Sequence, residues 1–141
     1  MKVLFDTNIV LDVLMDRLPY SDAAVALFSK VEEGAIIGYL SGTTITTVFY
    51  LAMKVVGAVK AKEEIKKLLK LFEVAPVNRH VLESALVLDF NDFEDAVIHE
   101  AACHIGADAI VTRNQKDFKK SRIPVYTSDE MSKILTPKSS T

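Results

Sequence analysis

The chain has 141 residues, the length of a single domain, and half of its residues are hydrophobic, which is enough for a buried core. Its formal net charge of −2 excludes a general attraction to nucleic acid, so such binding would need a local basic patch. The single cysteine, Cys103, excludes an internal disulfide and a cysteine-rich zinc site. No apolar run is as long as a membrane span and no signal-peptide pattern begins the chain, so we expect a cytoplasmic protein without a membrane partner.

The first half of the chain predicts two strands and four helices. Val3, Leu4 and Phe5 form a short apolar run typical of a buried strand, and the polar residues after it precede a helix over Ile9–Met15. Apolar residues at helical spacing, bounded by capping residues and glycines, predict the rest. In order, these are a helix from Ser21 or Asp22 to Gly34, a strand over 35–40, a helix from Thr43 or Thr44 to Gly57, and a lysine-rich helix over 60–72.

The second half predicts three strands and three helices. A strand over 74–77 is expected at the periphery of the sheet, because Pro76 has no N–H to donate to a central ladder. After it come a helix over 79–88, a helix ending at Gly106, a strand over 108–112, a charged loop over 113–120, a strand over 123–126, and a helix that begins with a Thr127–Glu130 capping-box pattern and ends at Leu135. The alternation predicts one α/β domain over residues 1–135 with a parallel sheet, and a flexible tail over 136–141.

Acidic and amide side chains gather where predicted strands end or helices begin. They form three groups. The first is Asp6, after the first strand. The second is Asp89, Asp92, Glu94 and Asp95, before and within the start of one helix, and the third is Asn114 and Asp117, after the strand over 108–112. The carboxyl ends of parallel strands share one edge of a sheet, so these groups are expected to converge there. Clustered carboxylates repel one another unless a cation lies among them, and oxygen ligands suit Mg²⁺ or Mn²⁺.

Helix capping is the alternative explanation for these acids. Asp6 or Thr7 can cap the helix that follows the first strand, and Asp92 can cap the helix that follows it. The helix dipole also favours acids in a first turn. Capping accounts for one or two acids, whereas four lie within residues 89–95, so the convergence of three groups favours a metal site.

The ordered motifs resemble the PIN domain family, and within it the toxins of VapBC-type toxin–antitoxin pairs. They are Asp6-Thr7-Asn8, Phe93-Glu94-Asp95-Ala96-Val97 and the segment Val111–Phe118, and the resemblance spans residues 1–135. It implies a three-layer α/β/α sandwich whose central, mostly parallel sheet has four to five strands. It also implies a metal-dependent endoribonuclease that uses Mg²⁺ or Mn²⁺, a small antitoxin partner and a homodimer.

Carried over position by position, the resemblance makes Asp6, Asp95 and Asp117 the expected catalytic and metal-binding acids. Asp92 and Asn114 are the further expected metal ligands. The expected supporting residues are Asn8, which would orient Asp6, together with Thr47 and Thr112.

Two of these positions depart from the usual family pattern. The family usually has a glutamate about six residues after the serine that ends the second strand, and counting from Ser41 gives Thr47. A Thr-Arg-Asp motif is common after the later strand, where this chain has Thr112-Arg113-Asn114. The first departure points to a subgroup that lacks the helix glutamate. Both leave a second hypothesis open, a catalytically weakened PIN-like module that binds RNA or a protein partner.

Basic residues beside the acids are candidates for binding RNA. They are Arg113, Lys116, Lys119 and Lys120, which could contact the phosphate backbone around an acidic centre. The alternative is an ordinary solvated loop. Single-stranded or looped RNA is the expected target, because duplex RNA hides its base edges.

Other chemistries fit the sequence less well. His99 and His104 are five residues apart, not the four that would place two zinc ligands on one helix face. A haloacid-dehalogenase-like phosphatase also begins with a strand that ends in aspartate, but it needs a second aspartate where this chain has Asn8. There is no glycine-rich phosphate-binding loop or dinucleotide motif.

Overall fold

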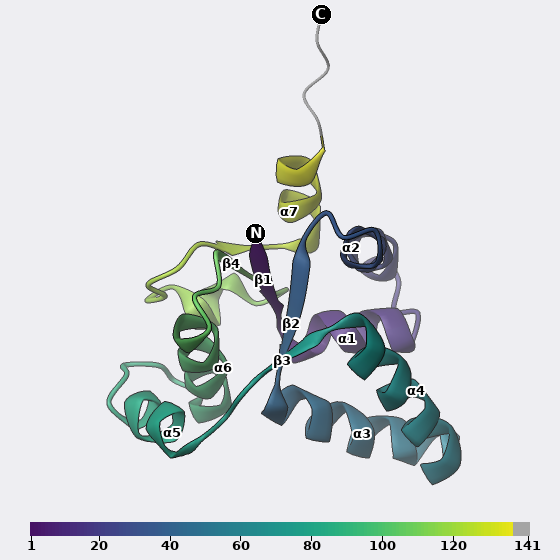
Figure 1. Ribbon diagram of the computed structural model, residues 1–141, viewed down its shortest axis with the longest axis horizontal. Helices are drawn as coiled ribbons and strands as arrows, with labels where there is room; N and C mark the ends of the chain where they lie inside the picture. Colours follow the sequence, from purple (N-terminus) through teal and green to yellow (C-terminus); the bar gives the residue numbers. More distant parts are fainter. Residues whose placement is uncertain (137–141) are drawn as a thin grey trace, which may run out of the picture.

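Five parallel strands form the central sheet of the computed structural model, which describes residues 1–136 (Figure 1). The strands are β1 (Lys2–Phe5), β2 (Ile37–Ser41), β3 (Glu73–Ala75), β4 (Ala109–Val111) and β5 (Val125–Tyr126). Their order across the sheet is β3-β2-β1-β4-β5, and each neighbouring pair is parallel. β3 lies at one edge and ends just before Pro76, which confirms the peripheral position predicted for that strand.

The predicted helices are present, with small differences at their ends. They are α1 (Thr7–Leu14), α2 (Ser21–Glu32), α3 (Gly42–Val56), α4 (Ala58–Leu71), α5 (Arg79–Leu86), α6 (Phe93–His104) and α7 (Ser128–Leu135). Thr127 and Glu130 form the predicted capping box before α7. The prediction of a loop over 113–120 was wrong in one respect, because Gln115–Phe118 form a 3₁₀ helix, η1. Burial of the Phe118 side chain holds this segment against the core.

Helices cover both faces of the sheet because consecutive residues of a strand point to opposite sides. Val3 and Phe5 of β1 pack in a core formed with α1, α2, α3, α4 and α7. Leu4, which lies between them, packs in a second core with α5 and α6. Figure 1 shows α5 and α6 on one side of the strands and α1, α3 and α4 on the other. The predicted three-layer α/β/α sandwich is thus confirmed, with a wholly parallel sheet.

The strands all end at the same edge of the sheet because they run in the same direction. After β1 the chain passes directly into α1, whose N-cap is Asp6, and after β2 it passes into α3, whose N-cap is Ser41. The Asp6 N–H donates to the carbonyl oxygen of Val111 over 2.9 Å, which joins the end of β1 to the end of β4. The segments that leave β1, β2 and β4 therefore start close together.

The described part of the chain contains no helix that is both long and apolar enough to cross a bilayer. A cytoplasmic location and a single domain over residues 1–135 stay predictions. The flexible tail was predicted over 136–141, and residues 137–141 lie outside the described part of the chain.

An aromatic cluster fills the core between the sheet, α2 and α4. The rings of Phe5, Phe28 and Phe72 lie edge to face, with centroids 5.8, 5.4 and 5.0 Å apart. Gly38 of β2 lies against Phe72, and a β-carbon at position 38 would be only 2.7 Å from two ring atoms. The absence of a side chain at Gly38 therefore lets Phe72 reach the sheet.

Replacing Gly38 with alanine is expected to lower the free energy of unfolding by about 1–3 kcal/mol, the usual cost of overfilling a packed core. Urea denaturation followed by circular dichroism measures this change. Gly42→Ala is the matched control, because the nearest atom to a β-carbon there is 3.8 Å away. A Gly38→Ala protein as stable as the unaltered one would show that Phe72 can shift without loss of packing.

Candidate metal centre

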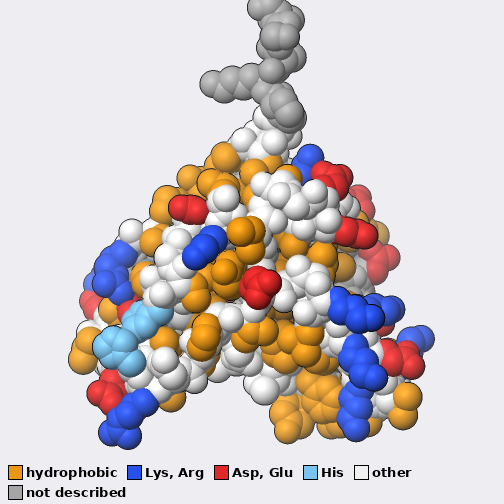
Figure 2. Space-filling view, in the orientation of Figure 1, with side chains coloured by type: hydrophobic (Ala, Val, Ile, Leu, Met, Phe, Trp, Pro, Cys, Tyr) orange, Lys and Arg blue, Asp and Glu red, His pale blue; other side chains and the backbone are white. Residues whose placement is uncertain are grey.

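A pocket of about 280 Å³ lies at the edge where the strands end. In Figure 2 the outline of the molecule is hollowed between the part that holds α5 and α6 and the part that holds α3 and α4. The lining residues are Asp6, Thr7, Asn8, Leu11, Thr47, Leu51, Asp92, Glu94, Asp95, Ile98, Asn114 and Asp117. Every metal ligand proposed from the sequence is in this set, together with Asn8 and Thr47. The structure therefore brings the expected acids into one place.

Asp6 is the most firmly held of the acids. Its side chain is 4% exposed, and each carboxylate oxygen accepts a hydrogen bond of 2.8 Å, one from the Thr7 N–H and one from the Thr112 hydroxyl. The Asn114 N–H donates to the same Thr112 hydroxyl over 3.1 Å, which fixes the threonine in turn. Asn8, which was expected to orient Asp6, lines the pocket. The hydrogen bonds that orient Asp6 in this structure come from Thr7 and Thr112.

Burial and neighbouring acids change the protonation of two carboxyls in the pocket. Burial raises the pKa of Asp6, while the hydrogen bonds from Thr112 and Thr7 act to lower it. Burial, followed by the charges of Asp6, Asp92 and other acids, raises the pKa of Asp95 to about 7. Without a cation, Asp95 is therefore partly protonated near neutral pH.

The two predicted helix caps are found, and both are also lining residues of the pocket. Asp6 is the N-cap of α1, and Asp92 is the N-cap of α6, with its side chain accepting the Asp95 N–H over 3.2 Å. Asn114 and Asp117 lie before and within η1, where the Asp117 N–H donates to the Asn114 carbonyl over 3.0 Å. Both of these side chains are exposed to solvent.

Glu94, one of the acids expected at this edge but not among the expected metal ligands, also lines the pocket. It lies in the first turn of α6, and its Oε1 is 3.4 Å from the Thr47 hydroxyl of α3. The sequence signal was its position next to Asp95 in an acidic run, which could equally be explained by the helix dipole. Only the contact between Thr47 of α3 and Glu94 of α6 distinguishes these explanations.

The donor set of the pocket fits a hard divalent cation. Carboxylates from Asp6, Glu94, Asp95 and Asp117 surround it, and the amide of Asn114 adds a neutral oxygen. Such oxygen donors are those that Mg²⁺ and Mn²⁺ prefer. Binding a cation would also relieve the repulsion that raises the pKa of Asp95.

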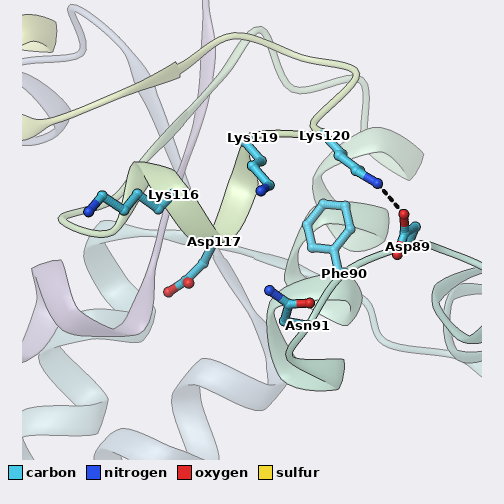
Figure 3. Close-up of a pocket in the computed structure, with 7 residues that line it drawn as sticks. All are labelled: Asp89, Phe90, Asn91, Lys116, Asp117, Lys119 and Lys120. Atoms are coloured by element: carbon cyan, nitrogen blue, oxygen red, sulfur yellow. Dashed lines mark hydrogen bonds and ion pairs between the residues drawn. The ribbon is translucent and has the colours of Figure 1, made fainter.

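A smaller pocket of about 100 Å³ adjoins the acidic one and carries the lysines proposed to bind RNA (Figure 3). Its lining residues are Asp89, Phe90, Asn91, Lys116, Asp117, Lys119 and Lys120. Asp117 lines both pockets, so the lysines lie directly beside the acids. Figure 3 shows Lys119 near Asp117 and Phe90, and Lys120 paired with Asp89. Lys116 and Lys119 are exposed.

Arg113, the fourth basic candidate, neutralises a buried acid. Its Nε lies 3.1 Å from Oδ2 of Asp12, whose side chain is fully buried on α1, and its guanidinium lies 4.2 Å from the centre of the Tyr20 ring. Arg113 also lines a further pocket with Lys116 and Asp117, which adjoins the lysine pocket. The sequence analysis missed Asp12, although an aspartate within the apolar run from Ile9 to Leu14 was a signal of a buried ion pair.

A second group of potential metal ligands, His99, Glu100 and Cys103, lies on α6 away from the acidic pocket. Their donor atoms are already engaged. The Arg122 N–H donates to Nε2 of His99 over 3.0 Å, and the Arg122 guanidinium donates to Oε1 of Glu100 over 2.5 Å. The group therefore fastens the segment before β5 to α6.

Comparison with known proteins agrees with this architecture. The model of the PIN domain family matches residues 2–116, a segment that includes Asp6 and Asp95 and ends one residue before Asp117. Ribonuclease VapC1 of Aquifex aeolicus (strain VF5) is 28% identical over 134 residues, which cover 92% of each chain.

Two solved structures show the same fold. A toxin–antitoxin complex from Klebsiella pneumoniae matches with a TM-score of 0.67 and 25% identity, covering 89% of this chain and 97% of that one. DNA-bound VapBC from Salmonella typhimurium matches with a TM-score of 0.67 and 15% identity, covering 91% and 98%. On the family match over most of its length, this chain belongs to the PIN domain family, and it is similar to the VapC toxins.

Proposed function

We propose that this protein is a metal-dependent endoribonuclease of the PIN type and the toxin of a toxin–antitoxin pair. The observation that carries the proposal is the single pocket in which Asp6, Asp95 and Asp117 meet from three separate parts of the chain. The similar proteins support it, since one is a ribonuclease and another is a toxin–antitoxin complex.

In this mechanism Asp6, Asp95 and Asp117 would hold Mg²⁺ or Mn²⁺, with Asp92 and Asn114 as additional oxygen donors. Thr112 and the Thr7 N–H keep the Asp6 carboxylate in a fixed orientation. A bound divalent ion would provide a water of lowered pKa as nucleophile and neutralise charge on the scissile phosphate.

RNA would approach along the lysine pocket beside the acids. Lys116 and Lys119 are the strongest candidates to bind its phosphates, because their side chains are exposed and neither forms a salt bridge within the described residues. Lys120 forms an ion pair with Asp89, and Arg113 forms an ion pair with Asp12. Single-stranded or structured RNA with unpaired bases is the proposed substrate.

The proposed antitoxin would bind an apolar groove on another part of the surface. The groove has a volume of about 580 Å³ and is lined by Leu11, Val13, Leu14, Met15, Ala52, Val55, Val56, Lys60 and Glu64. Val55 of this lining is 70% exposed, and Val59 in the first turn of α4 is 77% exposed. Apolar surface of this kind is typical of sites that bind another protein. A homodimer stays an expectation.

A weakened PIN-like module that binds RNA or a protein partner is the second candidate. Thr47 and Asn114 favour it, because both are neutral at positions where acids are usual. This alternative predicts RNA or protein binding that is independent of divalent cations.

Calorimetric titration of the metal-free protein with Mn²⁺ tests the metal site. We expect saturable binding, and we expect Asp6→Asn/Asp95→Asn to abolish it together with cleavage of a synthetic RNA pool that has a randomised centre. The matched control is Asp16→Asn/Asp22→Asn, which removes the same charge from exposed positions. Absence of Mn²⁺ binding by the unaltered protein would refute the nuclease proposal in favour of the module.

The stability of the metal-free protein is expected to fall as pH rises. Asp95 has a pKa of about 7 when folded and an ordinary value of 3.8, so the folded state binds more protons in this interval. The stabilisation is present below about pH 4 and is lost as pH rises through about 7. Urea denaturation in EDTA should show a smaller decline for Asp95→Asn than for the unaltered protein. Identical pH profiles would contradict the assignment.

Removing Lys116 and Lys119 together is expected to weaken RNA binding and its dependence on salt. Each phosphate contact contributes about 0.7 to the slope of log affinity against log salt for a single strand, so Lys116→Ala/Lys119→Ala should lower the slope by about 1.4. Fluorescence anisotropy with labelled single-stranded RNA in EDTA measures this without cleavage.

The control for this measurement is Lys62→Ala/Lys66→Ala on α4, whose lysines form a separate basic strip at the right of Figure 2. This control removes the same net charge and should leave the salt dependence unchanged. Equal effects of the two double variants would mean that RNA responds to overall charge and not to the lysine pocket.

A further inference from the structure

We propose that Glu94 supplies, from α6, the carboxylate that α3 lacks, and that Thr47 positions it as a metal ligand. The inference rests on the proposed metal-dependent function. It concerns one contact between two helices, the hydrogen bond of 3.4 Å from the Thr47 hydroxyl to Oε1 of Glu94.

The position of this contact carries the argument. Thr47 lies on α3 at the place expected for an acid, and its side chain lines the acidic pocket. Glu94 enters the same pocket from the first turn of α6, next to Asp95. The carboxylate of Glu94 therefore reaches the side chain that stands where the α3 acid would be.

A glutamate at position 47 and the glutamate at position 94 are alternatives to each other because both carry a negative charge. A glutamate at position 47 would place a second carboxylate within hydrogen-bonding reach of Glu94, and two such groups repel when both are ionised. Threonine at position 47 instead donates a hydrogen bond to Glu94. Within residues 1–136, the one side-chain hydrogen bond of Glu94 is to its Oε1, which leaves Oε2 to face a cation.

A purely local role for Glu94 is the competing explanation. An acid in the first turn of a helix interacts favourably with the helix dipole, and α6 has two, Glu94 and Asp95. That role needs no partner on α3, and an acid moved to α3 could not perform it. Moving the charge between the helices therefore separates the two explanations.

The experiment is a Mn²⁺ titration of three variants of the full chain by calorimetry. Glu94→Gln should weaken Mn²⁺ binding by about tenfold or more, as loss of a ligand or its close support does. Thr47→Glu/Glu94→Gln, which returns the charge to α3, should bind more tightly than Glu94→Gln alone. Glu63→Gln, on the exposed face of α4, removes an equal charge and should bind as the unaltered protein does. Circular dichroism confirms that each variant is folded.

The outcomes separate the inference from the function on which it rests. Unchanged Mn²⁺ affinity of Glu94→Gln, with binding by the unaltered protein, would overturn the role of Glu94 and leave the metal site standing. If Glu94→Gln weakens Mn²⁺ binding and Thr47→Glu/Glu94→Gln does not improve it, the proposal that Glu94 on α6 replaces an acid on α3 would be overturned. Absence of binding by the unaltered protein would overturn both proposals.

Discussion

The common direction of the five strands is the constraint on which the candidate site depends. It places the ends of β1 and β4 side by side, where the Asp6 N–H bonds to Val111 and the Thr112 hydroxyl bonds to the Asp6 carboxylate. Helices begin at once after β1 and β2, so polar capping residues collect at the same edge. A parallel sheet thus gathers polar side chains without requiring them to be close in sequence.

Capping and metal binding, which were alternatives for the sequence, coexist in the structure. Asp6 and Asp92 both cap helices, and both line the acidic pocket. Capping uses one oxygen of Asp92 and leaves the other for the pocket. Burial, together with the charges of neighbouring acids, raises the pKa of Asp95, so its carboxyl is not fully ionised at neutral pH. Such a raised pKa is typical of functional sites.

The sequence predicted what depends on periodicity and topology. Apolar runs placed Asp6 and Asn114 after buried strands, and the parallel sheet implied that they would meet. The sequence could not predict side-chain contacts between elements that are far apart along the chain. The bond between Thr47 and Glu94 joins residues 47 positions apart, and no local pattern marks it. The Asp12–Arg113 pair is similar, because only the fold shows which arginine covers a buried acid.

The segment after β4 shows how the core prepares the site. Phe118 anchors it in one core, while Arg113 covers Asp12 on the opposite side of the sheet. Between these anchors, the Asn114 N–H holds Thr112, which holds Asp6. Asp6 is therefore fixed by packing before any ion binds. Asn114 and Asp117 are exposed, so their side chains can adjust their positions. An arriving cation would meet a preorganised Asp6 carboxylate and adaptable ligands from the segment after β4, and the fixed orientation of Asp6 lowers the ordering cost of binding.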